Sequence, residues 1–214
     1  MRMFSPVLTA VLAGIFLPIA APAQTCTGNA GFSDTPLRLT AALDLGEGYT
    51  SIGGGVLSGK PNALFFGGGL ALVSPDFGDG GIALSGLVGK EIERPLGEKL
   101  RWCPFAGLTH TTNGGFGGSV TDFAIGGTVG YPLQSSGSGT TRFILTGGYT
   151  GVYERYELAA GFGSAEEWFG IIDAGVGIIL SENLSITPGV RLYFRFSGGR
   201  DPSIVVRGSY GLGR

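Results

Sequence analysis

The sequence predicts an all-β protein, in which ten antiparallel strands close into an up-and-down transmembrane β-barrel, with eight strands as the fallback. Three observations support this prediction. Apolar and polar residues alternate with a period of two along most of the chain, as in strands with one apolar face. Mean hydropathy is +0.30, yet nothing after residue 23 reaches the roughly 18 consecutive apolar residues of a membrane helix. Glycine accounts for 42 of 214 residues and charged residues for only 14%, so the apolar surface has to lie on sheets.

Residues 1–23 have the features of a cleaved export signal. Arg2 makes a short basic start, the segment 4–20 is apolar, and small residues around position 22 form a cleavage motif. An uncleaved membrane anchor is the alternative, which the two prolines of the apolar segment disfavour. We therefore expect a signal peptide over residues 1–23, a periplasmic N-terminal segment over 24–36 and the barrel over 37–214.

Ten segments carry the alternating pattern and fill the rest of the chain. In the clearest one, the even positions from Leu184 to Phe196 are apolar, and the odd positions between them are polar, aromatic or glycine. Glycine runs such as 53–55 lie inside these segments, where missing side chains relieve crowding in a narrow, strongly curved barrel. The predicted strands are 37–45, 49–58, 63–74, 80–92, 99–110, 119–133, 140–154, 167–180, 184–197 and 203–213.

The connections between these segments alternate in length as a barrel requires. With both chain ends in the periplasm, every second connection lies outside the cell, and the outer connections are the longer ones. The two longest, 110–118 and 155–166, fall on the outer count, and the short 181–183 falls on the inner count. The first connection, 46–48, is short for an outer loop, and fusion of its two strands would reduce the barrel to eight.

Aromatic residues concentrate near both ends of the predicted outward face, which is typical of side chains at membrane interfaces. A soluble β-sandwich with aromatic residues at its strand ends is the alternative. The periplasmic ends carry Phe66, Trp102, Tyr131, Phe143 and Tyr210, and the outer ends carry Tyr49, Tyr153, Trp168, Phe194 and Phe196.

With an export signal, alternating strands, a glycine-rich interior and aromatic ends, the chain resembles the small outer-membrane β-barrels of Gram-negative bacteria. That group includes the outer membrane proteins W, X and A. The resemblance covers residues 37–214 and rests on pattern instead of a diagnostic motif. It implies a monomer in the cell outer membrane, with lipid and the barrel-assembly machinery as partners. The formal net charge of −2 gives no reason to expect a nucleic-acid partner.

The two cysteines of this exported chain are expected to form a disulfide. Cys26 lies near the start of the mature chain and Cys103 near the start of the fifth predicted strand, so both are at the periplasmic end. Alternation turns Cys103 toward the lumen, opposite to Trp102. A bond between them would hold segment 24–36 across or within the periplasmic mouth. Two free thiols are the alternative.

Charged residues gather on the predicted inward faces. The cluster that we single out consists of Asp44, Asp173, Arg191, Arg195 and Arg207. Asp44 joins it if the first strand closes against the tenth. One interpretation is a salt-bridge network that fills the lumen, which the packed interior of small barrels favours. The other is an Arg-lined constriction that prefers anions, and buried charges must be paired in either case.

The residues that could carry chemistry are few. The chain has one histidine, His110, with Thr112 two positions on and Asp122 as the nearest acid in sequence. This is similar to the His-x-Ser arrangement of lipid A deacylase barrels, but threonine is a poor substitute for that serine. The glycine runs lack a following helix and so do not form nucleotide-binding loops. We expect no catalytic residue, no metal and no cofactor.

The expected function is that of an outer-membrane barrel with a narrow, largely filled lumen and a structural or surface-interaction role. A narrow channel for small solutes is the main alternative. A lipid-modifying enzyme of the outer membrane and a soluble periplasmic β-sandwich are two further ones. The cysteine positions favour the first function over a general porin, because a disulfide at the periplasmic end would narrow the tube.

Overall fold

The structure is a computed structural model that describes residues 25–30, 36–59, 63–75, 80–93, 100–113, 118–133, 141–157, 163–195 and 201–212. The predicted signal peptide, residues 1–23, lies outside the described residues. Within the described ranges, no helix is long and apolar enough to cross a membrane.

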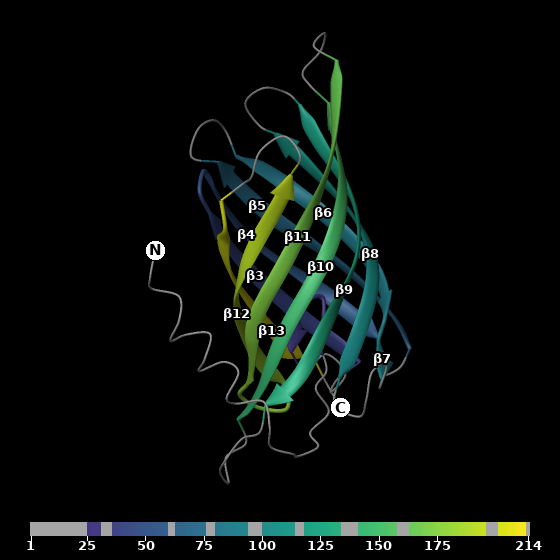
Figure 1. The fold of residues 1–214 in the computed structure, drawn as a ribbon, viewed down its shortest axis with the longest axis vertical. Coiled ribbons are helices and arrows are strands. Elements are labelled where there is room, and N and C mark those ends of the chain that lie inside the picture. The colour runs from purple at the N-terminus through teal and green to yellow at the C-terminus, as the bar shows by residue number, and fades with distance from the viewer. Residues whose placement is uncertain are drawn as a thin grey trace.

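Ten long antiparallel strands form one closed barrel (Figure 1). Each long strand pairs with its neighbours along the chain, and β3 closes the ring by pairing with β13. The short β7 (Ile92–Glu93) follows β6 and also pairs with β8. The ten strands are β3 (Leu37–Gly46), β4 (Tyr49–Gly59), β5 (Leu64–Pro75), β6 (Gly81–Lys90), β8 (Arg101–Asn113), β9 (Ser119–Leu133), β10 (Arg142–Glu157), β11 (Ser164–Ile179), β12 (Leu184–Arg195) and β13 (Ser203–Gly211).

The prediction of ten strands is confirmed, and the eight-strand fallback is wrong. Gly46 pairs with Tyr49, which leaves Glu47 and Gly48 as a two-residue turn between β3 and β4. Gly48 has a φ of 80°, a conformation that glycine adopts without steric cost. Because two-residue turns join antiparallel strands tightly, the first two strands stay separate in spite of their short connection.

Several strands extend beyond their predicted ends. β10 extends to Glu157 and β11 begins at Ser164, which pair with each other, so the connection expected over 155–166 shortens to 158–163. These two green strands rise beyond their neighbours in Figure 1. β8 likewise extends to Asn113, which places His110 inside a strand. A strand continues as long as its neighbour supplies backbone hydrogen bonds. The residue at which this pairing stops cannot be predicted from composition alone.

The two faces of the barrel wall differ as the alternation predicts. Large apolar side chains are exposed on the outer face, where Ile125 is 69% exposed, Leu84 61% and Leu70 60%. Exposed apolar surface of this extent is unfavourable in water and favourable against hydrocarbon. Closure of the ring also pairs the strand edges, which a span through lipid requires.

Glycine allows the backbones of neighbouring strands to lie close together at some positions of the wall. Gly55 of β4 faces Gly69 of β5. A Cβ added at Gly55 would lie only 2.5 Å from the carbonyl oxygen of Gly68. A side chain at this position would therefore push β4 and β5 apart.

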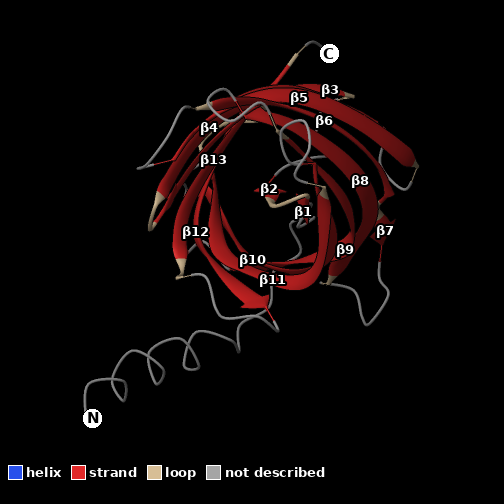
Figure 2. Cartoon of the chain, turned by 90° about the horizontal axis from the view of Figure 1, so that it is seen from above, coloured by secondary structure: helices blue, strands red, loops and turns tan. Residues whose placement is uncertain are grey.

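A short hairpin, formed by β1 (Thr25–Cys26) and β2 (Asn29–Ala30), lies inside the barrel (Figure 2). Its turn residues Thr27 and Gly28 have φ values of 53° and 76°, as in the type I′ turns that favour two-residue hairpins. It contacts β8 and β9 on one side and β11, β12 and β13 on the other. The described part of the expected periplasmic segment 24–36 is thus a plug hairpin within the lumen.

Candidate functional site

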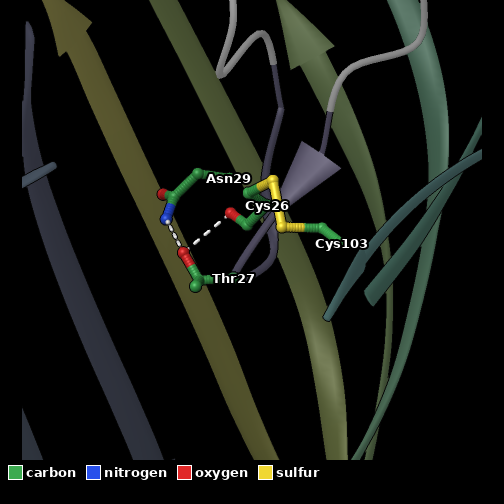
Figure 3. Close-up of a disulfide and its surroundings, with 4 residues drawn as sticks. All are labelled: Cys26, Thr27, Asn29 and Cys103. Carbon is green, nitrogen blue, oxygen red and sulfur yellow. Dashed lines mark hydrogen bonds between the residues drawn. A yellow bond between two sulfur atoms is a disulfide. The ribbon is translucent and has the colours of Figure 1, made fainter. Parts of the chain in front are cut away.

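A disulfide attaches one side of the plug hairpin to the barrel wall. The predicted bond between Cys26 and Cys103 is present and joins the hairpin to β8 (Figure 3). Both cysteines are fully buried, and they pack with Leu57 and Phe65. The Thr27 hydroxyl donates a hydrogen bond of 2.7 Å to the carbonyl oxygen of Cys26 (Figure 3). The disulfide therefore lies in a small apolar core inside the lumen.

Packing and a hydrogen bond attach the other side of the plug hairpin. Ala30 is fully buried against Ile144 and Ile179. The Ser185 hydroxyl donates a hydrogen bond of 2.7 Å to the carbonyl oxygen of Ala30, and it lies 2.7 Å from the Ser209 hydroxyl. Together with the disulfide, these contacts hold the hairpin between opposite walls of the periplasmic end.

Four residues of the predicted charge cluster meet inside the lumen, in what we call the central network. Arg191 lies 2.6 Å from Asp44 and 3.0 Å from Asp173, nitrogen to oxygen. Arg207 lies 3.2 Å from the same oxygen of Asp173. Asp44 belongs to β3 and Arg191 to β12, so their contact depends on the closure of β3 against β13. The formal charges of this network cancel.

Arg195, the remaining residue of the predicted cluster, belongs to a separate outer network. Its guanidinium lies 3.1 Å from Glu154 and 2.9 Å from Glu167. The same group lies over the ring of Phe169, 4.5 Å from its centre. Tyr156 donates a hydrogen bond from its hydroxyl to Glu154. The structure thus divides the predicted cluster between two networks.

The acidic partners of Arg195 were missed by the sequence analysis. Glu154 shares the inward face of β10 with the buried Val152, and Glu167 shares the inward face of β11 with Asp173. Alternate residues of a strand lie on one face. Glu154 is the last residue of the predicted strand 140–154 and Glu167 the first of 167–180, so continuing the alternation to these strand ends would have found both glutamates.

Tyr49 was expected among the outward aromatic residues, and this expectation is wrong. Its hydroxyl donates a hydrogen bond of 3.0 Å to Asp44 and lies 2.7 Å from the hydroxyl of Tyr193. Ile52 and Val56 are exposed on the outer face of β4, so the odd positions of this strand face the lumen. Tyr49 therefore extends the central network.

Aromatic side chains lie on the outward face of the other strands. Near the outer end, the ring centre of Tyr153 lies 4.9 Å from that of Trp168 and 6.3 Å from that of Phe123. Phe196 lies outside the described residues. The outward-facing residues that we single out as interface aromatics are Trp102, Tyr131, Tyr153, Trp168, Phe194 and Tyr210.

A cavity of about 820 Å³ occupies the outer part of the lumen. Thr27 and Asn29 of the plug hairpin lie at one end of it, and Glu47 of the first outer turn lies at the other. Charged and aromatic side chains line one wall. Small residues line the opposite wall, among them Ser51, Gly53, Gly55, Gly69, Ala71, Ala83, Ser85, Thr109 and Thr111. The lumen is filled at its periplasmic end and hollow toward the outside.

Apolar and polar side chains are arranged in the reverse of a soluble protein. Most of the large apolar side chains are exposed on the outer face, and the ion pairs of Arg191 and Arg195 lie inside. The chain is an outer-membrane β-barrel. The soluble β-sandwich is excluded, because a sandwich buries its apolar faces between two sheets whereas this wall closes on a polar interior.

The barrel is similar to solved structures of other barrels at low sequence identity. It covers 97% of the N-terminal β-barrel domain of Pseudomonas aeruginosa OprF with 83% of its own length, at 10% identity and a TM-score of 0.39. It covers 98% of Neisserial surface protein A with 84% of its length, at 12% identity and a TM-score of 0.41. It covers 98% of the beta domain of the Bordetella autotransporter BrkA with 82%, at 12% identity and a TM-score of 0.48. No family model and no curated protein sequence matches the barrel.

His110 and Asp122 lie on opposite faces of the barrel wall. His110 is exposed on the outer face of β8, with Nδ1 3.0 Å from the Thr121 hydroxyl, and Thr112 shares that face. Asp122 lines the cavity. The wall thus separates the base and the acid that a histidine-dependent reaction would bring together. Among the described residues, no group of three or more His, Cys, Asp or Glu side chains is placed to hold a metal ion.

Proposed function

We propose that this outer-membrane barrel does not conduct solutes and has a structural or surface-interaction role, as a monomer surrounded by lipid. One observation carries the proposal: the plug hairpin is attached to opposite walls, by Cys26 to Cys103 and by Ala30 to Ser185. A solute that enters the cavity from outside meets this hairpin. On this proposal the lumen is an outward-facing pocket with a closed floor.

The surroundings of the hairpin support a permanent seal. Cys26 and Cys103 have no exposed surface, so a reductant does not reach their bond while the barrel is folded. At the hairpin tip, a Cβ added to Gly28 would come within 2.8 Å of the Arg207 guanidinium. Arg207 is in turn paired with Asp173. The tip and the central network therefore restrain each other.

A narrow channel for small solutes is the second candidate, and the cavity favours it, since part of the path through the barrel is already open. This function would require the plug hairpin to move. Preference for anions has less support, because Arg191, Arg195 and Arg207 are each paired with at least one carboxylate. A paired guanidinium attracts a passing anion only weakly.

Conductance across planar lipid bilayers distinguishes the two candidates. We expect no channel events from the full chain. The double variant Cys26→Ser with Cys103→Ser frees one side of the plug hairpin and is expected to show openings. Thr111→Ala, which alters the cavity wall and keeps the disulfide, is the matched control and is expected to stay silent. Steady conductance of the unaltered barrel would contradict the proposal and support the channel.

A further inference from the structure

The disulfide of the plug hairpin is enclosed by the folded barrel. Cys26 and Cys103 are both fully buried, and neither lines the outer cavity. Toward the periplasm, Arg101 shares the inward face of β8 with Cys103 and is itself buried. Arg38 and Glu91 are buried at the same end. The two sulfur atoms are therefore out of reach of a bulky reagent while the barrel is folded.

The barrel wall continues past the disulfide toward the periplasm. Cys103 pairs with Thr128 of β9, and β9 runs on for five residues to Leu133, which is roughly 16 Å of strand. The lumen of a barrel of about this size holds side chains or one small ligand and has no room for a second protein. A protein that acts on Cys103 has to do so before the wall surrounds this residue.

The two sides of the plug hairpin pack against different parts of the chain (Figure 2). On one side, the apolar core around the disulfide comes from residues of β4, β5, β6 and β8, namely Leu57, Phe65, Leu87 and Phe105. On the other side, Ala30 packs against Ile144 and Ile179, and it accepts a hydrogen bond from Ser185 of β12. The core around the disulfide therefore needs only strands up to β8, whereas the second attachment needs strands that come later in the chain.

A disulfide forms by exchange with a disulfide that another molecule supplies. The thiolate of one cysteine attacks a sulfur of this donor, which forms a mixed disulfide and releases one donor thiolate. The thiolate of the second cysteine then attacks the mixed disulfide and releases the other donor thiolate. Two electrons and two protons pass from the two cysteines to the donor, which becomes a dithiol. During the second attack the donor lies directly beside both cysteines, and the closed lumen with its plug hairpin has no space for a protein there.

We propose that a periplasmic oxidoreductase with a reactive disulfide joins Cys26 to Cys103 before the barrel closes. The bond holds the plug hairpin at β8. Strands β10 to β13 then close around the hairpin, and the ring is completed when β13 pairs with β3. This order concerns how the barrel matures, and it is independent of whether the mature lumen conducts.

The rate at which the reduced chain is oxidised tests this order. The full chain is reduced and then either folded in detergent micelles, with heat-modifiable migration on gels as the check, or kept unfolded in dilute urea. Oxidised protein disulfide isomerase is the probe, and the thiols that remain are counted on gels after denaturation and labelling with a maleimide polymer. We expect rapid oxidation of the unfolded chain. The folded barrel should be oxidised at least about a hundredfold more slowly, since exchange then requires the barrel to open.

A thiol outside the lumen is the matched control for access to the periplasmic end. Lys90 is exposed at the end of β6. Lys90→Cys, combined with Cys26→Ser and Cys103→Ser, carries a single thiol there, and we expect it to react with the maleimide polymer in the folded barrel. The two native thiols of the folded, reduced chain should stay unlabelled under the same conditions.

The possible outcomes either support or overturn the inference. Oxidation of the folded, reduced barrel as fast as that of the unfolded chain would overturn it, and so would labelling of its native thiols as fast as that of Lys90→Cys. A reduced chain that does not fold under conditions in which the oxidised chain folds would support it, because the bond then has to precede closure. The comparison of oxidation rates does not depend on the folding of the Lys90→Cys variant.

Discussion

The periplasmic and outer halves of the lumen have the same wall of antiparallel strands and opposite contents. The periplasmic half is filled by the plug hairpin, with Phe65, Cys103 and Ile144 buried around it. The outer half has paired charges on one wall, small residues on the other, and a cavity between them. A closed barrel of this size can therefore be filled in one half and hollow in the other. The size of the inward-facing side chains along the barrel axis decides whether each part of the lumen is filled or open.

The two halves also depend on different interactions. A covalent bond, apolar contacts and hydrogen bonds of buried side chains such as Arg38 and Ser185 hold the periplasmic half. In the outer half, the Arg191 and Asp44 side chains keep 23% and 11% of their surface exposed. Ion pairs that keep some contact with water lose less hydration energy than fully buried ones. The cavity therefore suits the charged networks that border it.

The largest expected effect comes from removal of the disulfide in the periplasmic half. The bond joins cysteines 77 residues apart. On the chain-entropy model, a loop of this length stabilises the fold by about 4 kcal/mol. Urea unfolding of the variant Cys26→Ser with Cys103→Ser, followed by tryptophan fluorescence, should show this loss. An unchanged midpoint would mean that the covalent link does not hold this half together.

Breaking the central network of the outer half should have a smaller effect. Arg191→Met leaves Asp44 and Asp173 without their shared cation, and partial exposure limits the expected loss to about 2 kcal/mol. The control is Arg155→Met, whose pair with Glu157 is 3.7 Å long with side chains 49% and 61% exposed. That change should cost less than about 0.5 kcal/mol in the same unfolding assay. Equal losses for the two variants would remove the distinction between lumen and surface pairs.

The smallest expected effect concerns the hydrogen bond at the second attachment of the plug hairpin. Ser185→Ala removes the donor to the carbonyl oxygen of Ala30, and we expect a loss of about 1 kcal/mol in the free energy of unfolding. Thr111→Ala, in the outer half, serves as the control and should be nearly neutral. A larger loss for the control would show that the outer wall depends more on side-chain hydrogen bonds than the periplasmic end does.

Much of the fold could be predicted because strand patterns are local. The alternation located ten strands, and the positions of Cys26 and Cys103 at the same end of their segments indicated their bond. The predictions were wrong where the alternation was not followed along the whole strand. Tyr49 was assigned to the outward face although Ile52 and Val56 set the opposite parity, and the strand assigned to 167–180 began three residues late, at Ser164 in the structure.

The sequence by itself determined that this protein is a glycine-rich, ten-stranded barrel with an apolar outer face, because strand alternation depends only on neighbouring residues along the chain. Only the tertiary structure decided which charges pair and where the lumen is hollow. Asp44 meets Arg191 across 147 residues, and this contact requires ring closure and a particular register between β3 and β13. The plug hairpin and the cavity likewise depend on how side chains from strands far apart in the sequence together fill a cross-section of the lumen. A local sequence pattern does not reveal that packing.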